Sequence, residues 1–505
     1  MATLGLNLTA LSSGYPIPGS YVEVLFAQGQ SAGDLSAKKI LILAPSIAAG
    51  SIVQDSEVYG PISDETEVVA KVGAGSPAHR MARAVLSVNK AAQLYIVAPT
   101  RSAGVAATLS VTITGTATGA GVVRVELCEE TVDYAFASGD TPTAIAAGIS
   151  AAFNALTHLP AAAVPTAGVI AFTAKVAGPE GNALRLRASM TAGVTSAITA
   201  TSETAFASGA TAASLTNALA TIAALDFDVI VPHTHAGASS DPQLSALVTQ
   251  VNTQALPITG IRQKVIAGIA LAPATAVTLS QSINKPRLDL VNLEESPLEP
   301  SVVGAICAGV AANTYFVDPA ANLDSYGTKP EHVFPVKAPR NKGTNFTSTE
   351  LALMLNGGVT PIGVTATGTP YIVRQVTAYS LNGALADYRV RDSHRVYVAD
   401  WYADTALARL ATAPWTKLTD DPPNDVQPPA NFATPKRVKG LIEQLISDGC
   451  DLGYLDPAKK VAMLASLSVG IDPVNATRNN IGSNVFAANL LHQTAHLVRE
   501  TSAAA

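Results

Sequence analysis

The alternation of apolar and polar segments along the chain predicts an α/β protein. Residues 39–44, KILILA, form a short continuous apolar run of the kind that is buried in a parallel sheet. After residue 203, amphipathic segments alternate with short apolar runs. The predicted helices span 212–225, 242–256, 273–283 and 300–312, and the predicted strands span 227–231, 264–270 and 288–291. This spacing indicates right-handed βαβ crossovers and a mostly parallel sheet with helices on both faces.

The segment before this regular region begins a β-turn-helix-β pattern. Residues 67–72 are predicted as a strand, the turn Gly73-Ala74-Gly75-Ser76-Pro77 follows, and a helix through residue 92 leads to a strand at 94–98. The turn lacks the third glycine of a GxGxxG motif and the Gly-Lys-Ser/Thr of a P-loop, and no acidic residue follows the next strand. The sequence therefore disfavours a nucleotide site, and no cofactor is expected.

Residues 102–202 predict a self-contained β-rich module. Thr, Ala and Gly dominate this stretch, and it contains no cluster of acids or histidines. The strand patterns lie at 109–115, 122–128, 170–176 and 184–188, and a helix pattern opens at Thr141-Pro142. Because the α/β rhythm resumes afterwards, we interpret the module as a domain inserted into the α/β core.

The C-terminal third predicts a mixed α+β region. An apolar helix at 351–355 stops at Gly357-Gly358, and the side chains of 371–376 alternate with a period of two, which is typical of a strand. An amphipathic helix at 400–411 precedes the proline-rich stretch 414–433. A second helix spans 435–447, with Thr434 as its cap, and the tail from residue 461 has a β-like pattern.

The chain has few charges for its size. It has 505 residues, of which 48% are hydrophobic and 14% are charged, below the usual quarter. Such a composition favours a chain that buries much of its exterior against partner subunits. The net charge is −6 with no long run of either sign, which argues against nucleic acid as a partner.

The cysteines, the N-terminal residues and the apolar runs indicate the cellular compartment in which the protein is made. Cys128, Cys307 and Cys450 lie far apart, which is typical of buried thiols in a protein made in the cytosol rather than of a disulfide framework or a zinc site. The first residues lack the basic segment and apolar core of a signal peptide. No apolar run reaches the ~20 residues that cross a bilayer, so we expect no membrane insertion.

Candidate catalytic groups are sparse. His233 and His235 follow a predicted strand end, where α/β enzymes place functional groups, so a metal or acid–base role is one interpretation and a loop pair without chemistry is the other. Ser76 follows Gly75, and Ser239 follows a Gly-Ala pair, but neither serine lies in the G-x-S-x-G motif of a nucleophile elbow. We therefore expect no catalytic residue and no metal ligand, and the alternative function is an α/β hydrolase or a dinucleotide-binding enzyme.

Several stretches resemble one known family. The helix ending in NGGVTPI, the strand that carries Arg374 into VTAY and the run with Arg389, Arg391 and Arg395 are similar to the C-terminal core of contractile-tail sheath proteins. IPGSYVEV resembles the opening of these proteins, VGAGSPAHRMARAVLSVNKAAQLYIVA resembles a structural turn in them, and TPKRVKGLIEQLISDGCDLG resembles the last part of Mu-like sheath proteins. The family core is subtilisin-like in fold, which implies no activity.

The resemblance implies a fold class and a domain order. The fold class is α/β multidomain, with a mostly parallel sheath core, an inserted β-rich domain, an α+β C-terminal domain and extended arms at both ends. The expected parts are an N-terminal arm at 1–26, a discontinuous core at 27–101 and 203–350, an outer inserted domain at 102–202, a tube-facing C-terminal domain at 351–493 and a C-terminal arm at 494–505.

The resemblance also implies a function and partners. Sheath subunits stack as sixfold rings around a tail tube, and contraction of this helical sheath drives the tube through the host envelope. The implied partners are further copies of the chain, the tail tube protein, and the baseplate and tail terminator proteins. The implied location is the contractile tail of a myovirus-like virion that is assembled in the bacterial cytoplasm.

Two sets of residues are predicted to contact other subunits. Both termini have a strand pattern. An isolated strand is stable only when it is added to the edge of a sheet. We expect a neighbouring subunit to supply this edge through its residues 371–398. Pairing of the first strand within its own subunit is the alternative. The arm residues are Tyr21, Val22, Glu23, Val24, Leu25, Phe26, Thr494, Ala495, His496, Leu497, Val498 and Arg499. Lys436, Arg437 and Lys439 crowd the positive end of a helix dipole, so we expect them to face an acidic tube surface, a solvated basic face being the alternative.

Overall fold

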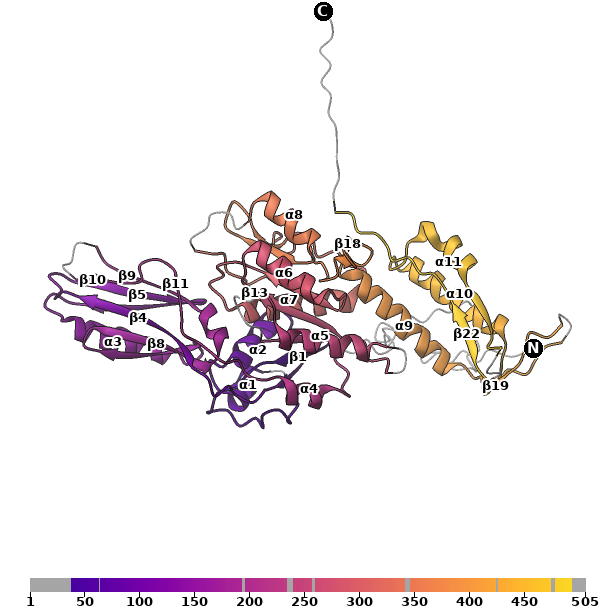
Figure 1. The fold of residues 1–505 in the computed structure, drawn as a ribbon, viewed down its shortest axis with the longest axis horizontal. Helices are drawn as coiled ribbons and strands as arrows, with labels where there is room; N and C mark the ends of the chain where they lie inside the picture. The colour runs from indigo at the N-terminus through magenta and orange to yellow at the C-terminus, as the bar shows by residue number, and fades with distance from the viewer. Residues whose placement is uncertain are drawn as a thin grey trace, which may run out of the picture. The chain divides into compact units, whose positions relative to one another are not determined.

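The computed structural model of the chain describes eight stretches, which all lie within the compact unit Lys38–Ala505. These stretches are 38–62, 64–192, 196–233, 239–256, 259–340, 346–423, 426–473 and 477–492. The predicted strands of both arms and His235 lie outside the described residues. Figure 1 shows the elements along the chain, coloured from indigo to yellow.

An eight-stranded sheet forms the centre of the fold, in the order β16-β15-β14-β13-β12-β1-β3-β2. All neighbours from β3 to β15 are parallel, whereas β2 and β16 join the two edges antiparallel. The strands are β1 (Lys39–Leu43), β2 (Tyr59–Ile62), β3 (Gln93–Val97), β12 (Val229–Pro232), β13 (Lys264–Ile269), β14 (Leu288–Asn292), β15 (Thr360–Val364) and β16 (Pro370–Ile372). The predicted mostly parallel α/β sheet is therefore confirmed.

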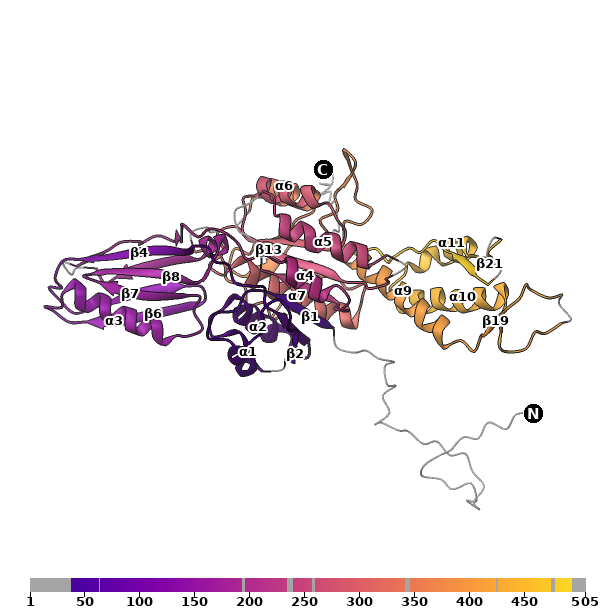
Figure 2. The same ribbon diagram turned by 60° about the horizontal axis from the view of Figure 1, so that its bottom comes forward.

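Helices cover both faces of this sheet, and the side-chain alternation of β1 shows how. Ile40 and Ile42 belong to the hydrophobic cluster on the face of α1, α2 and α7, whereas Leu41 and Leu43 belong to the cluster on the face of α4, α5, α6 and α8 (Figure 2). Because both faces are covered, the central strands are apolar throughout. The helices are α1 (Glu65–Val72), α2 (Pro77–Val88), α4 (Thr216–Ile222), α5 (Pro242–Gln254), α6 (Pro273–Ile283), α7 (Pro300–Val317) and α8 (Ser348–Asn356).

Helix α7 is the most buried helix of the core. Within the described residues it is the one helix that is long and apolar enough to cross a membrane. It packs instead on α2 and on β13, and 78% of its apolar window is buried inside the protein. Its composition is thus explained by its position as a core helix.

Between β3 and β12 the chain forms two four-stranded sheets, with strand orders β10-β4-β8-β7 and β11-β9-β5-β6, and α3 (Pro142–Ala155) packs on both. The strands are β4 (Ala106–Thr114), β5 (Gly121–Leu127), β6 (Glu130–Phe136), β7 (Ala161–Thr166), β8 (Val169–Ala177), β9 (Arg185–Met190), β10 (Ala197–Ile198) and β11 (Thr204–Ala205). The bridge between Val105 and Ala210 lies beyond the expected end at residue 202. Residues 104–210, named here the β module, therefore form this unit.

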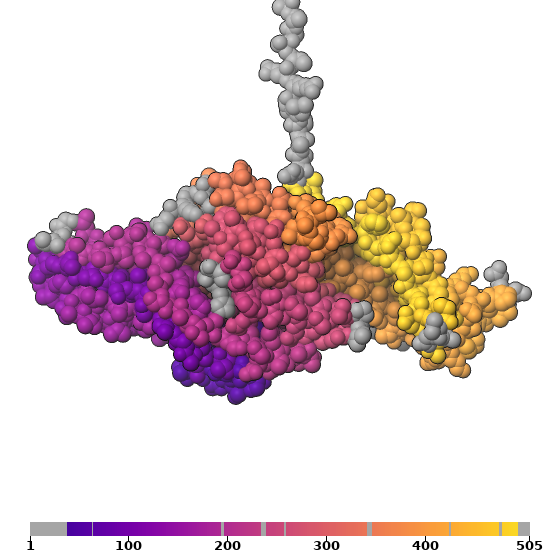
Figure 3. Space-filling model, viewed as in Figure 1, coloured from indigo at the N-terminus to yellow at the C-terminus, as the bar shows by residue number. Residues whose placement is uncertain are grey.

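Among the remaining elements, α9, α10, α11 and β21 pack around a third, smaller apolar cluster that includes Ile446, Leu455 and Met463. They contribute the orange-to-yellow surface in Figure 3. The remaining elements are the hairpin β17 (Leu381–Asn382) and β18 (Leu385–Ala386), α9 (His394–Thr412), β19 (Lys417–Leu418), β20 (Phe432–Ala433), α10 (Pro435–Asp451), α11 (Lys460–Ser466), β21 (Ser468–Ile471) and β22 (Asn479–Gly482).

Three sequence-based predictions are wrong. Residues 67–72 belong to helix α1, because the Asp64 carboxylate accepts a hydrogen bond from the Thr66 amide and caps a helix at this point. Residues 371–398 do not form a continuous strand edge, because β16 ends at Ile372 and α9 begins at His394. The tail from residue 461 is not β-like throughout, because helix α11 precedes the hairpin of β21 and β22.

The expected boundary at residue 351 separates elements that the structure joins. Helix α8 packs on α6, and β15 pairs with β14 through Val291 and Thr360. Elements α8, β15 and β16 therefore complete the central sheet layer, although they come from the stretch that the sequence assigned to a C-terminal domain.

Candidate functional site

The glycine-rich turn before α2 is closed by its own side chains. The Ser76 hydroxyl accepts the His79 amide at the helix N-terminus, and His79 Nδ1 accepts the Gly75 amide at 3.0 Å. A Cβ added at Gly75 would lie 2.3 Å from the Leu159 carbonyl oxygen of the β module. The cavity beside the turn has a volume of about 20 Å³, which is room for one water and not for a phosphate. The turn is a packing device, as the resemblance implied.

His233 lies directly after β12, as the sequence predicts, and is half-buried. Its backbone amide donates to the Leu43 carbonyl at 2.9 Å, which continues the ladder between β12 and β1. Its side chain borders the same small cavity as Gly75 and Glu299. The structure brings no group of three candidate metal ligands together around His233 within the described residues.

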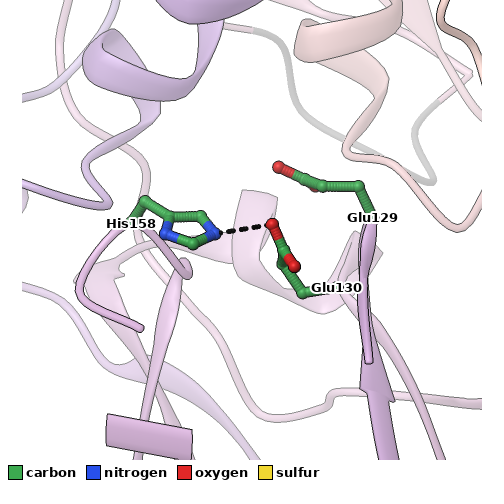
Figure 4. Close-up of side chains that lie close together, drawn as sticks. All are labelled: Glu129, Glu130 and His158. Carbon is green, nitrogen blue, oxygen red and sulfur yellow. Dashed lines mark hydrogen bonds and ion pairs between the residues drawn. The ribbon is translucent and has the colours of Figure 1, made fainter. Parts of the chain in front are cut away.

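One trio of potential metal ligands does occur in the described part of the chain, at Glu129, Glu130 and His158 (Figure 4). His158 Nε2 and Glu130 Oε1 lie 2.9 Å apart. The Arg80 guanidinium donates to both oxygens of Glu129, at 3.2 and 2.9 Å, and Arg83 approaches the same carboxylate at 3.6 Å. The guanidinium groups of Arg80 and Arg83 occupy the space beside Glu129, and their positive charges would repel a metal cation there. The trio therefore serves as part of an ion-pair cluster.

The Glu129 carboxylate shows which force dominates this cluster. Burial by itself raises the pKa of Glu129, but the charge of Arg80 and its hydrogen bonds outweigh burial and leave that pKa lowered. Arg80 is buried and also contacts Glu299, the residue that precedes α7, with Nε 2.5 Å from Oε2. The cluster therefore fixes the β module to α2 and α7.

The arrangement most similar to a nucleophilic site is Ser393, Lys264 and Asp289. The Ser393 hydroxyl donates to Asp289 Oδ2 at 2.6 Å and contacts Lys264 Nζ, which lies 3.0 Å from Asp289 Oδ1. The three residues are 0–1% exposed, so no external substrate reaches the hydroxyl. Burial raises the pKa of the Asp289 carboxyl and lowers that of the Lys264 amine, and each opposite charge counteracts this effect. We conclude that Lys264 and Asp289 form a structural ion pair and that the Ser393 hydroxyl bridges the two side chains.

Sequence reasoning missed Lys264 and Asp289. The available signal was a charged residue inside the apolar runs KVIAGI and LDLVN, because a charge in a strand buried on both faces requires a partner. The two residues lie on different strands, and the Ser393 hydroxyl that contacts both is more than a hundred positions away from each, so the sequence did not identify the pair.

The three predicted basic residues in the first turns of α10 differ in their surroundings. The Arg437 side chain donates to the carbonyl oxygens of Pro428, Pro429 and Phe432 at 2.7–2.8 Å. Lys436 is exposed, and the Lys439 ammonium lies 3.9 Å from Glu443. Arg437 thus holds the proline-rich segment, and the two lysines remain as candidates for contact with a tube.

Several of the described sheets end in a strand whose outer edge a strand from another subunit could join. Tyr326 covers the outer edge of β16 through a bridge to Ile372, whose amide donates to the Tyr326 carbonyl at 2.9 Å. The two-stranded sheet of β21 and β22 pairs only with itself among the described residues, with Ser468 opposite Gly482, so each strand keeps one unpaired edge.

The chain is similar in sequence to a known tail sheath protein. The Mu-like prophage FluMu tail sheath protein of Haemophilus influenzae is 23% identical over 521 residues, which cover 98% of this chain and 99% of that protein. The chain thus resembles contractile phage tail sheath proteins of the Mu-like type over nearly its full length, and the predicted resemblance is confirmed. No family model matches the sequence.

Solved structures of the same class are similar at lower identity. The sheath tail protein of Desulfitobacterium hafniense is 13% identical, with a TM-score of 0.46, and the match covers 93% of this chain and 100% of that chain. The sheath tail protein of Listeria innocua is 14% identical, with a TM-score of 0.44 and coverages of 90% and 95%. A chain of the anti-feeding prophage baseplate is 11% identical, with a TM-score of 0.46 and coverages of 97% and 100%. By their names, these relatives are tail sheath or baseplate proteins.

Proposed function

We propose that the chain is the subunit of a contractile phage tail sheath, which polymerises as stacked sixfold rings around a tail tube and contracts to drive the tube through the host envelope. The observation that carries this proposal is the resemblance to a tail sheath protein over 98% of the chain. Contraction would then be a switch between two packings of one folded subunit, without nucleotide hydrolysis.

The proposed partners are other copies of the chain, a tail tube protein, and baseplate and terminator proteins, and assembly takes place in the bacterial cytoplasm. The described surface supports self-association. Exposed apolar side chains are concentrated in the C-terminal third, where Leu385 is 76%, Val461 80% and Leu491 77% exposed. A subunit that assembles into a larger particle would bury such side chains against its neighbours.

We propose that the arms, at 1–26 and 494–505, add strands to a neighbouring subunit, and that the acceptor is the sheet of β21 and β22 rather than residues 371–398. The unpaired edges of this sheet support the proposal, because each offers backbone donors and acceptors to an incoming strand. The β module at 104–210 would be the outer domain, and the part after residue 373 would be the tube-facing domain.

Removal of the arms tests this function. Chains that lack residues 1–26 or 494–505 are expected to remain folded but to sediment as monomers, whereas the full chain forms large assemblies at the same concentration. A matched control replaces Val53 with Ser, because Val53 is 60% exposed and lies outside the C-terminal third of the chain. Truncated chains that sediment like the full chain would contradict the proposed role of the arms.

A further inference from the structure

Four consecutive residues, Asp392-Ser393-His394-Arg395, lie where three parts of the chain meet. They begin helix α9, and the first three are at most 8% exposed. Together their side chains contact the central sheet, the segment that follows β16 and residues 488–492. This tetrapeptide is named here the α9 junction.

Ser393 faces the central sheet. Its hydroxyl contacts both members of the buried pair formed by Lys264 of β13 and Asp289 of β14. The Gln375 side chain donates to the same Asp289 oxygen at 2.8 Å, and the Gln375 carbonyl accepts the Ser393 amide. The start of α9 is therefore fixed to the interior of the sheet by groups that have no access to water.

His394 and Arg395 face the opposite way, toward the segment that precedes the C-terminal arm. His394 Nε2 donates to the Ala488 carbonyl at 3.1 Å, and Arg395 donates to the Asn489 side chain at 2.7 Å. The Ala488 amide in turn donates to the Tyr454 carbonyl at 3.0 Å. Residues 486–492, named here the arm root, are thus held by the junction and by the loop after α10.

Asp392 connects the two sides. It accepts two hydrogen bonds from Arg374, at 2.8 and 2.5 Å, and lies 3.7 Å from Nε2 of His492 in the arm root. The other nitrogen of His492 contacts Asp324, which lies in the loop after α7. One carboxylate therefore contacts both the segment that follows β16 and the last described residue of the chain.

We propose that the α9 junction couples the arm root to the buried Lys264–Asp289 pair, so that a displacement of the C-terminal arm is transmitted to the central sheet rather than absorbed by a loose tail. In a sheath this coupling would carry force between subunits, and that reading rests on the proposed function. The residues of the junction are positioning residues, because they contact no partner themselves. The four residues share one backbone segment at the start of α9, so a shift of that segment would change all of these contacts together, which is the physical reason for the coupling.

Hydrogen exchange on the full, unassembled chain tests the coupling. Ser393→Ala removes contacts with the core, chiefly with the sheet pair, and none with the arm root, yet we expect the amides of residues 486–492 to exchange about tenfold faster, because the junction loses its anchor. Arg395→Met removes the contact with Asn489 of the arm root and a weaker ion pair with Asp392 at 4.0 Å, and we expect faster exchange at residues 374–378. The matched control is Arg389→Met, since Arg389 is 73% exposed and pairs with Asp387.

An effect of Ser393→Ala that stays within β13, β14 and residues 374–378, with unchanged exchange at 486–492, would overturn the proposal. If Ser393→Ala does not fold, Arg395→Met decides the question alone, and unchanged exchange at 374–378 would then overturn it. Both exchange measurements are made on the unassembled chain, so they do not depend on the arm-truncation experiment. If the truncated chains assembled normally, the proposed role of the arms would be wrong, but the coupling could still be observed.

Discussion

Arg80 and Glu299 form an ion pair inside the protein, with Arg80 Nε 2.5 Å from Glu299 Oε2. The same guanidinium holds Glu129 at the start of β6 with two further hydrogen bonds. The side chain of Arg80 is 2% exposed, so water replaces none of these contacts. One arginine thus joins two helices of the core to the β module.

Replacement of Arg80 tests the strength of this connection. Arg80→Met leaves Glu299 without its cation in a buried site, and we expect the free energy of unfolding to fall by about 3 kcal/mol in urea titrations. The matched control is Arg83→Met on the same helix, which is 39% exposed and should cost less than about 1 kcal/mol. Equal losses for the two variants would show that Arg80 does not connect the units.

Excision of the β module tests whether it is an insertion. Val105 and Ala210 exchange two backbone hydrogen bonds of 3.1 Å, so the ends of the module are adjacent and a short Gly-Ser linker can replace residues 104–210. We expect the remaining chain to fold and to assemble, with lower stability because Arg80 loses Glu129. Circular dichroism melting provides the measurement, and loss of soluble, cooperatively melting protein would contradict the expectation.

The stability of the chain should decrease in mild acid because of His394. Burial lowers its pKa from 6.5 to about 4; the charges of Arg395 and His492 act in the same direction, whereas the Ala488 carbonyl and Asp392 oppose it. The unfolded chain therefore binds a proton at a higher pH than the folded chain does. Between pH 6.5 and pH 4 this difference costs about 3 kcal/mol of unfolding free energy.

Unfolding titrations from pH 7 to pH 4 measure this effect. His394→Gln retains a donor for Ala488 but does not titrate, so its stability should depend less on pH than that of the natural chain. His79, whose pKa burial also lowers, supplies a second acid-sensitive group that the variant retains. An unchanged pH dependence in His394→Gln would show that His394 does not contribute to acid sensitivity.

The basic residues of α10 give a prediction that separates two roles. Charge reversal at Lys436 and Lys439 should weaken binding of the chain to tail tubes at low salt, where screening is least, without changing its stability by more than about 1 kcal/mol. Arg437→Met should instead speed amide exchange in residues 428–433, because three carbonyl oxygens lose their donor. Unchanged co-sedimentation of the lysine variants with tubes would contradict a tube-facing role.

Local signals predicted the elements that carry them. Thr434 accepts the Arg437 amide and Pro435 occupies the first turn of α10, as the sequence indicates, and Thr141-Pro142 begins α3 in the same way. The error at α1 arose because the apolar pairs of EVVAKV dominate a short segment, whereas its cap, Asp64, lies just before them.

Long-range contacts set the limits of prediction. The alternating pattern after Tyr371 predicts a long strand, but Gln375 turns toward Asp289 and Arg374 toward Asp392, so the ladder stops at Ile372. The partners of Arg437 lie within ten positions of it, yet their recognition depends on the turn that the prolines form. Residues whose role depends on such contacts cannot be recognised from the sequence pattern around them.

Negative-stain electron microscopy of the purified, concentrated full chain tests the central claim most directly. A sheath subunit buries its exposed apolar surface and its unpaired sheet edges on other copies, so we expect rings or tubes of uniform width in the absence of any other protein. A field of uniform small particles at high concentration, with no rings or tubes with or without added tail tubes, would contradict the account.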